Sequence, residues 1–157
     1  PEKSFVSGLL HDMGKMILAY YFPESFKKIL VLSQKKRIIY RKAEERILPG
    51  GHHEIGYYIA KKWDIPIHIA NTLYSHHNLE IGATTYEDCL IVNTADAIIN
   101  SYTSDFLNNN MCPDRIDNRY FNEQVRKEMK LWIDSSPKWF PEVNEMIEEA
   151  FKLFFEK

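Results

Sequence analysis

Apolar residues recur at the spacing of an α-helix along almost the whole of this chain, and this pattern restricts its fold more than any other feature. Ile55, Ile59 and Trp63, for example, lie four residues apart on one stripe of a helix. No clear run alternates strictly between apolar and polar residues, so a sheet is not expected. With 157 residues, of which 45% are hydrophobic, the chain is predicted to form one all-α domain.

Prolines, glycines and polar stretches divide this helical pattern into segments. Pro23 stands at an early helical position, where its missing N–H is harmless, and the Pro-Gly-Gly sequence at 49–51 stops a helix. Helices are expected to end near Leu10, to begin at Pro23, and to cover 16–22, 41–48, 52–63, 66–77, 86–101, 119–133 and 141–154, with a long polar surface loop over 104–118. Residues 1–104 are predicted to form the helical core, and residues 105–157 a loop and helices that pack on the same domain.

Charge, cysteine content and hydropathy exclude several classes of protein. The net charge is −2 and the isoelectric point is about 6.3, so no strong field attracts the chain to nucleic acid or to an anionic membrane. The short basic patches at 35–37 and 41–42 are interpreted as solvated helix faces. No apolar run reaches the roughly 18 residues of a membrane span, and no secretory signal is present. Two cysteines are too few for a disulfide framework, so Cys89 is expected as a buried free thiol in a reducing cytoplasm.

Histidine and aspartate residues stand in or beside apolar runs at four places in the chain. An unpaired charge in such surroundings is costly to bury, so each cluster needs a partner. A metal ion is a partner that converging clusters could share, and imidazoles with carboxylates but no thiolates suit iron, manganese or zinc. The candidate ligands in these clusters are His11, Asp12, His52, His53, His76, His77 and Asp96.

Each candidate taken alone also has an ordinary structural interpretation. The sequence Asp-Ile-Pro at 64–66 precedes the helix predicted over 66–77. On that helix, a rotation of about 100° per residue places His77 near the centre of the apolar face and His76 to one side. Such an inward histidine is often only a hydrogen-bonded core residue. His52 could be a cap or a loop residue, and His53 is expected to be exposed. Asp96 could be compensated by a buried salt bridge or hydrogen bond.

Five ordered stretches within residues 4–100 carry these clusters. They are Gly8-Leu9-Leu10-His11-Asp12-Met13-Gly14-Lys15, Phe22-Pro23-Glu24, His52-His53-Glu54-Ile55-Gly56 with Lys62-Trp63-Asp64-Ile65-Pro66, Tyr74-Ser75-His76-His77-Asn78 and Ile91-Val92-Asn93-Thr94-Ala95-Asp96-Ala97. In this order they resemble the HD superfamily of metal-dependent phosphohydrolases, and the HDOD branch of it most closely.

The resemblance implies an HD-like helical bundle and assigns roles to the clustered residues. Asp12 would bridge two ions and take part in catalysis, Lys15 would contact a substrate phosphate, and one or two divalent ions (Fe, Mn or Zn) would bind. The implied metal ligands are His11, Asp12, His52, His76, His77 and Asp96. In the superfamily an earlier helix supplies a further histidine to the first ion. The sequence given starts at Pro1, about ten residues before His11, so we expect either that it is a fragment of a longer protein or that the domain has lost this ligand. The Gly-Tyr-Pro signature after the paired histidines is also absent, so the resemblance does not imply cyclic dinucleotide hydrolysis.

Three hypotheses about function follow. The first is a regulatory domain of bacterial signal transduction with a metal-capable pocket and a protein partner, a neighbouring signalling domain or a second copy of the chain. The uncovered aromatic residues at 20–22 fit such an interface. The second is a metal-dependent phosphodiesterase or nucleotidase with a nucleotide or phosphodiester ligand, which an upstream helix carrying a histidine would favour. The third is a metal-free all-α scaffold whose histidines and aspartates form hydrogen bonds in the core.

Overall fold

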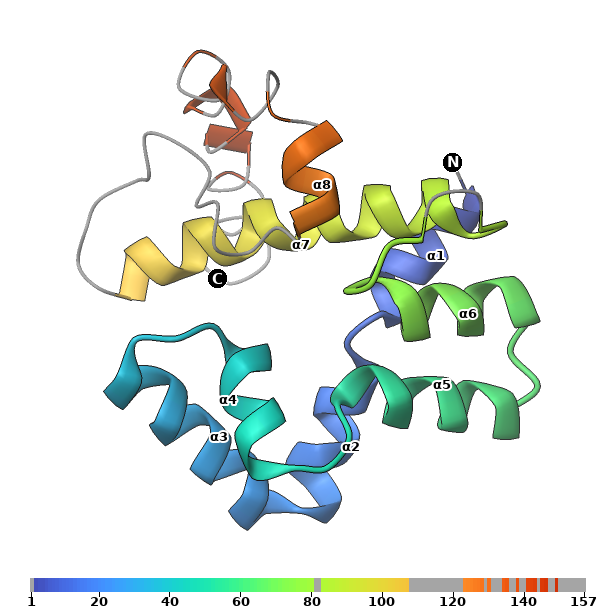
Figure 1. Cartoon of the computed structure of the whole chain (residues 1–157), viewed down its shortest axis with the longest axis vertical. Helices are drawn as coiled ribbons and strands as arrows, with labels where there is room; N and C mark the ends of the chain where they lie inside the picture. The colour runs from blue at the N-terminus through green and yellow to red at the C-terminus, as the bar shows by residue number, and fades with distance from the viewer. Residues whose placement is uncertain are drawn as a thin grey trace. The chain divides into compact units, whose positions relative to one another are not determined.

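The computed structural model describes residues 2–80, 83–107 and 123–128, together with 130, 134, 135, 138, 141–143, 145, 146 and 149. Every element in this part of the chain is a helix, which confirms the predicted all-α class (Figure 1). The helices are α1 (Glu2–Leu10), α2 (Met13–Tyr21), α3 (Pro23–Lys36), α4 (Tyr40–Ile47), α5 (His52–Lys62), α6 (Ile67–Ser75), α7 (Tyr86–Leu107) and α8 (Glu123–Glu128).

The chain divides into two compact units, residues 1–93 and residues 94–157, and each is described here by itself. Helix α7 runs through the division between them. The predicted start of a loop at Ser104 is wrong, because α7 continues to Leu107. No glycine or proline interrupts the chain between Tyr86 and Cys112, so its polar residues do not end the helix.

Three expectations concern residues that the structure describes only in part. The rest of the loop predicted to end at residue 118 lies outside the described residues. Helix α8 lies within the helix predicted over 119–133, and the helix predicted over 141–154 is described only at scattered positions. The division of the chain at residue 104 stays a prediction.

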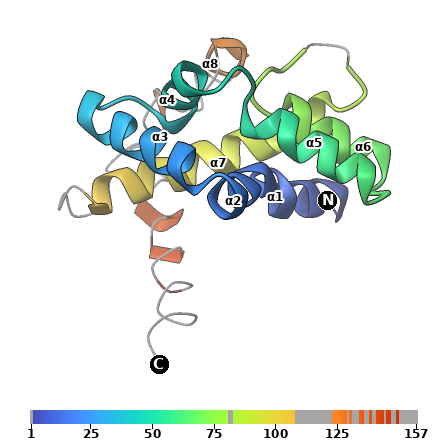
Figure 2. The ribbon, with the colours of Figure 1, turned by 90° about the horizontal axis from the view of Figure 1, so that it is seen from below.

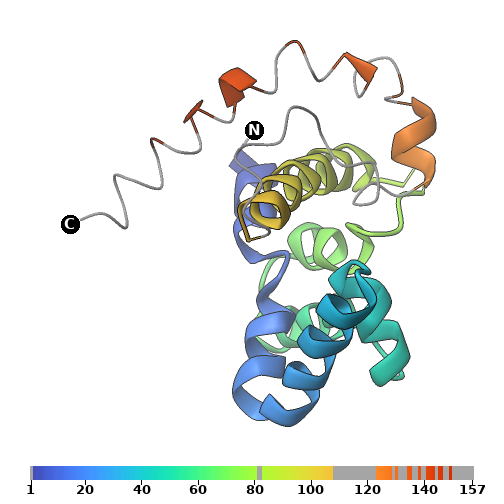
Figure 3. The same cartoon turned by 90° about the vertical axis from the view of Figure 1, so that its left-hand side faces the viewer.

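The core of the first unit forms where α2, α5 and α6 pack together. Helices α5 and α6 lie side by side, as do α3 and α4 (Figures 2 and 3). Five buried apolar residues make up this core: Met13, Ala60, Ile69, Ala70 and Leu73. Helix α2 begins at Met13, three residues earlier than the predicted segment, and so places its first turn inside the core.

Glycine allows α2 and α5 to approach at backbone distance. A Cβ atom on Gly14 would lie 1.9 Å from the carbonyl oxygen of His52 and 3.0 Å from the backbone nitrogen of Gly56. These atoms cannot rotate away, so only a residue without a side chain fits here. This contact holds the start of α5 against the turn between α1 and α2, which carries His11 and Asp12.

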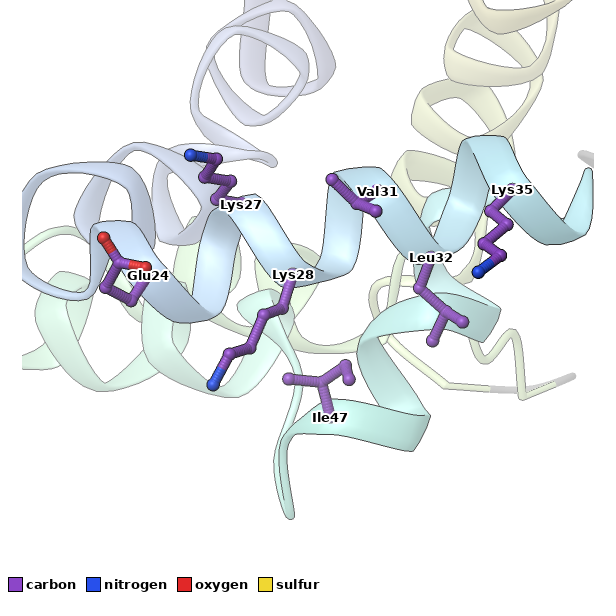
Figure 4. A pocket seen from close by; sticks show the side chains of 7 residues that line it. All are labelled: Glu24, Lys27, Lys28, Val31, Leu32, Lys35 and Ile47. Atoms are coloured by element: carbon purple, nitrogen blue, oxygen red, sulfur yellow. The ribbon is translucent and has the colours of Figure 1, made fainter.

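A groove of about 430 Å³ lies between α3 and α4 (Figure 4). Its apolar lining consists of Val31, Leu32 and Ile47, and lysines of α3 stand along it. Residues 35–37, at the end of α3, are exposed, as predicted for a solvated basic face. Cys89 is a buried free thiol, again as predicted. None of the helices described above is both long enough and apolar enough to cross a membrane.

Candidate metal centre

The first part of the centre is the turn between α1 and α2, which carries His11 and Asp12. The His11 Nδ1 atom lies 2.7 Å from the carbonyl oxygen of Gly8. A carbonyl oxygen only accepts, so this nitrogen donates and a neutral His11 has its lone pair on Nε2. That Nε2 atom lies 3.3 Å from Asp12 Oδ2, which also accepts a 2.6 Å hydrogen bond from Lys15 Nζ.

Asp12 is ionised at neutral pH. Burial by itself raises the pKa of Asp12, but contact with His11 and the ammonium group of Lys15 outweigh burial and hold this pKa well below its ordinary value. The Oδ1 atom of Asp12 is buried and has no hydrogen-bond partner among the described residues. The carboxylate is therefore a negative charge with an unused acceptor atom, as expected of a metal ligand.

The second part of the centre is His52, the first residue of α5 and a fully buried side chain. Its Nδ1 atom lies 2.7 Å from Oε2 of Glu44 on α4, and its Nε2 atom lies 3.3 Å from Asp12 Oδ1. Because Nδ1 donates to the Glu44 carboxylate, a neutral His52 presents a lone pair and not a proton to Asp12. Two electron-rich atoms face each other at this point, an arrangement that a cation between them would stabilise.

The third part of the centre is the turn that follows α6. His76 is fully buried; its Nδ1 atom lies 2.6 Å from the carbonyl oxygen of Leu73, and its Nε2 atom has no hydrogen-bond partner among the described residues. His77 is less buried, and its Nε2 atom lies 3.0 Å from His52 Nε2. Burial, followed by the neighbouring histidines, lowers the pKa of both His76 and His77 well below the ordinary value, so both rings are neutral at pH 7.

Three sequence predictions about this region are wrong in detail. His76, and not His77, is the more deeply buried ring, because α6 ends at Ser75 with His76 as its C-cap and the helical projection does not extend to His77. His53 is half-buried and not exposed, with its ring near those of Tyr74 and His77. Arg41 is not simply solvated, since its guanidinium donates hydrogen bonds to the His77 carbonyl and to Asn78.

Two groups of three ligand atoms result from this arrangement. One group is His11, Asp12 and His76, and the other is His52, His76 and His77. Within each group the ligand atoms lie no more than 4.8 Å apart, and His76 belongs to both groups. Nitrogens that ligate one ion at 2.0–2.1 Å lie roughly 3 Å from each other, which matches the separation of the two Nε2 atoms of His52 and His77.

These residues fit a divalent metal ion. His11, His52 and His76 each direct Nδ1 to an oxygen acceptor, the arrangement that orients Nε2 of a ligating histidine. Two of the buried side-chain atoms without a hydrogen-bond partner among the described residues, His76 Nε2 and Asp12 Oδ1, belong to residues of these groups. A donor set of imidazoles and a carboxylate suits iron, manganese or zinc.

Two predicted site residues have other partners. Asp96 lies in the second unit, where its carboxylate accepts a 2.7 Å hydrogen bond from Asn100, so its role as a ligand stays a prediction. Lys15 pairs with Asp12 and lies 5.0 Å from the centre of the Tyr40 ring. Its contact with a substrate phosphate likewise stays a prediction.

Sequence reasoning missed Glu44, which contacts His52 more closely than any other side chain described here. In the sequence this residue stands within the charged helical segment 41–46, where an acidic residue ordinarily faces water. The only signal was its position about one turn along from Tyr40 and next to Ala43, and this is too weak to indicate burial.

Comparison with known proteins agrees with the geometry. Residues 1–79, half of the chain, match the family model of the HDOD domain. An uncharacterized protein of Treponema pallidum (strain Nichols) is 30% identical over 84 residues, which cover 54% of this chain and 16% of that protein. This chain therefore matches about a sixth of the length of that relative. No solved structure matches the chain significantly. On the evidence of its sequence match and its helical His/Asp centre, the chain belongs to the HDOD domain family.

Proposed function

We propose that this HDOD domain is a regulatory domain of bacterial signal transduction, and that its His/Asp centre binds one or two divalent ions of iron, manganese or zinc. The observation that carries the metal proposal is His76. Its Nε2 atom is buried without a hydrogen-bond partner among the described residues, and it belongs to both ligand groups. A buried nitrogen lone pair with no donor is costly, and coordination removes that cost.

Five residues would hold the ions, and the resemblance adds Asp96 as a sixth. The five are His11, Asp12, His52, His76 and His77. When bound, such ions act as Lewis acids and lower the pKa of a coordinated water. Asp12 contributes the negative charge that offsets the ions, and the hydrogen bonds at Nδ1 orient the three rings. The regulatory role is supported by the HDOD family match and by the missing Gly-Tyr-Pro signature.

The metal proposal is tested by elemental analysis of protein purified without chelator or affinity metal. We expect one or two equivalents of iron, manganese or zinc in the wild type, and a loss of metal in His76→Gln. His68→Gln, on the same helix but in neither ligand group, is the matched control and keeps its metal. A folded wild type that contains no metal and takes up none on titration contradicts the proposal.

A second candidate, a metal-dependent phosphohydrolase, is favoured by Lys15. This cation lies beside the ligand Asp12 on the first turn of α2, where it could pair with the phosphate of a nucleotide or phosphodiester. The test is turnover of a panel of nucleotides and phosphodiesters by metal-loaded protein. Hydrolysis that Lys15→Met lowers at unchanged metal content supports the enzyme, and inert metal-loaded protein contradicts it.

The regulatory role also needs a partner, and we infer a neighbouring domain of a longer polypeptide. Four large apolar side chains of α1 and α2 are each more than 70% exposed: Phe5, Leu9, Met16 and Tyr20. Exposed apolar surface of this kind is typical of interfaces, and the T. pallidum relative continues far beyond the matched segment. Hydrogen exchange should be slower in α1 and α2 in a longer natural protein than in this chain alone; equal rates contradict the inference. The cytoplasmic location stays a prediction.

A further inference from the structure

Glu44 is the most deeply buried acidic residue among those whose burial the structure describes. The exposed fraction of its side chain is 1%, although the next residues of the same helix, 45–47, are exposed. Acidic side chains are almost never fully buried unless they are paired. The partners of Glu44 therefore explain why this position keeps a carboxylate.

Both carboxylate oxygens of Glu44 contact a single residue, His52. Oε1 accepts a 3.0 Å hydrogen bond from the backbone N–H of His52, and Oε2 lies 2.7 Å from its Nδ1 atom. The backbone N–H belongs to the first turn of α5, where a negative charge is favourable. One side chain thus fixes both the start of the helix and the rotation of the ring.

The surrounding backbone leaves room for this pair. A Cβ atom on Gly51, the residue before His52, would lie 3.1 Å from Glu44 Oε2 and 2.5 Å from Nδ1 of His53. A larger residue at this position would force one of these groups to move. The Pro-Gly-Gly turn therefore does more than end α4, since it also allows the carboxylate to reach the histidine.

The contact determines which nitrogen of His52 carries the hydrogen. A carboxylate accepts, so Nδ1 is protonated and the lone pair of neutral His52 lies on Nε2. That atom faces Asp12 Oδ1 at 3.3 Å and His77 Nε2 at 3.0 Å. The corresponding Nδ1 atoms of His11 and His76 lie against backbone carbonyls, whereas the Nδ1 atom of His52 lies against a side-chain carboxylate.

We propose that Glu44 is a positioning residue of the metal centre, which holds His52 in the Nδ1–H tautomer with the lone pair of its Nε2 atom directed at Asp12 and His77. The effect on metal affinity rests on the proposed function, whereas the effect on the tautomer does not. Groups that hydrogen-bond to a ligating histidine in this way change metal affinity by about 10–100-fold when they are replaced.

The variant Glu44→Gln tests this role because glutamine offers one acceptor and one donor. The His52 backbone N–H can only donate, so the glutamine oxygen must face it. The glutamine NH₂ group then faces Nδ1, which has to accept. The ring proton is thereby moved to Nε2, the nitrogen that faces Asp12 and His77.

Two measurements follow the change. Nitrogen-15 NMR of metal-free protein at mildly alkaline pH should show the Nδ1–H tautomer of His52 in the wild type and the Nε2–H tautomer in Glu44→Gln. Competition with a chromogenic chelator should show metal affinity about 10–100-fold weaker in the variant. Glu54→Gln is the matched control, because it also replaces one glutamate near the start of α5 by glutamine. Glu54 lies in the first turn of α5 and accepts a hydrogen bond from the backbone N–H of Gly51, whereas Glu44 contacts the ring of His52.

The tautomer measurement separates this proposal from the proposed function. If the wild type binds no metal but shows the Nδ1–H tautomer, the function proposal fails and the positioning role of Glu44 stands. An Nε2–H tautomer of His52 in the wild type overturns the role of Glu44, even if Glu44→Gln does not fold. A folded Glu44→Gln protein with wild-type tautomer and wild-type metal affinity overturns it as well.

Discussion

Replacement of Gly14 by alanine should destabilise the protein and weaken the metal centre together. The new Cβ atom would lie 1.9 Å from the carbonyl oxygen of His52, whereas real Cβ contacts are essentially never shorter than 3.0 Å. The difference, 3.0 − 1.9, requires α2 and α5 to separate by about 1 Å. Overpacking of this kind costs about 1–3 kcal/mol, and the better helix propensity of alanine returns about 0.5–1 kcal/mol of it.

The same displacement affects the ligands, because His52 is the residue that is pushed away. Its Nε2 atom lies 3.3 Å from Asp12 Oδ1, so a shift of about 1 Å would separate the parts of the centre. Urea denaturation gives the change in free energy of unfolding, and metal titration gives the change in affinity. Gly8→Ala is the control, since a Cβ atom there has only an ordinary contact, 4.0 Å from Val92. A Gly14→Ala protein with the stability and metal affinity of Gly8→Ala would refute the close approach of α2 and α5.

Three further predictions concern metal removal, pH and the core. Chelation of the metal-loaded protein should lower its Tm, because bound ligand stabilises only the folded state; an unchanged Tm argues against a structural contribution of the centre. Metal-free protein should lose stability as the pH falls below about 6.5. Burial lowers the pKa of His76 and His77 in the folded state, so at such pH the unfolded chain binds protons that the folded chain does not. Denaturation at several pH values should show a weaker pH dependence in His76→Gln, and an equal dependence contradicts this assignment. Leu73→Ala should cost about 2–5 kcal/mol, since Leu73 is fully buried, whereas a cost below 1 kcal/mol in urea denaturation would show that its surroundings collapse around the smaller side chain.

The sequence was most informative where a backbone signal and an apolar pattern agreed. Pro23 begins α3, and the Pro-Gly-Gly sequence precedes α5, as predicted. Prediction failed where the end of a helix decided the outcome. The ranking of His77 above His76 assumed that α6 continued to His77, and its end two residues earlier, at Ser75, was enough to reverse their burial.

Tertiary contacts account for what sequence patterns could not provide. Glu44 lies in a charged segment, and only the fold shows that its carboxylate is buried against His52. The role of Gly14 depends in the same way on a partner far along the chain, since no local feature indicates that its backbone meets α5. Local propensity determines which segments are helical, and it contains no information about which helix ends meet.

The position of the centre at helix ends offers a physical basis for the proposed regulatory role. The turn with His11 and Asp12 joins α1 to α2, His52 opens α5, and the paired histidines follow α6. An ion held by these residues would tie together the ends of four helices, each of which would otherwise be free to fray. Loss of the ion would leave buried lone pairs at the same helix ends and favour their separation. Metal occupancy could thus alter the packing of α1, α2, α5 and α6 without any chemical step. Two of these helices, α1 and α2, also carry the exposed apolar residues Phe5, Leu9, Met16 and Tyr20.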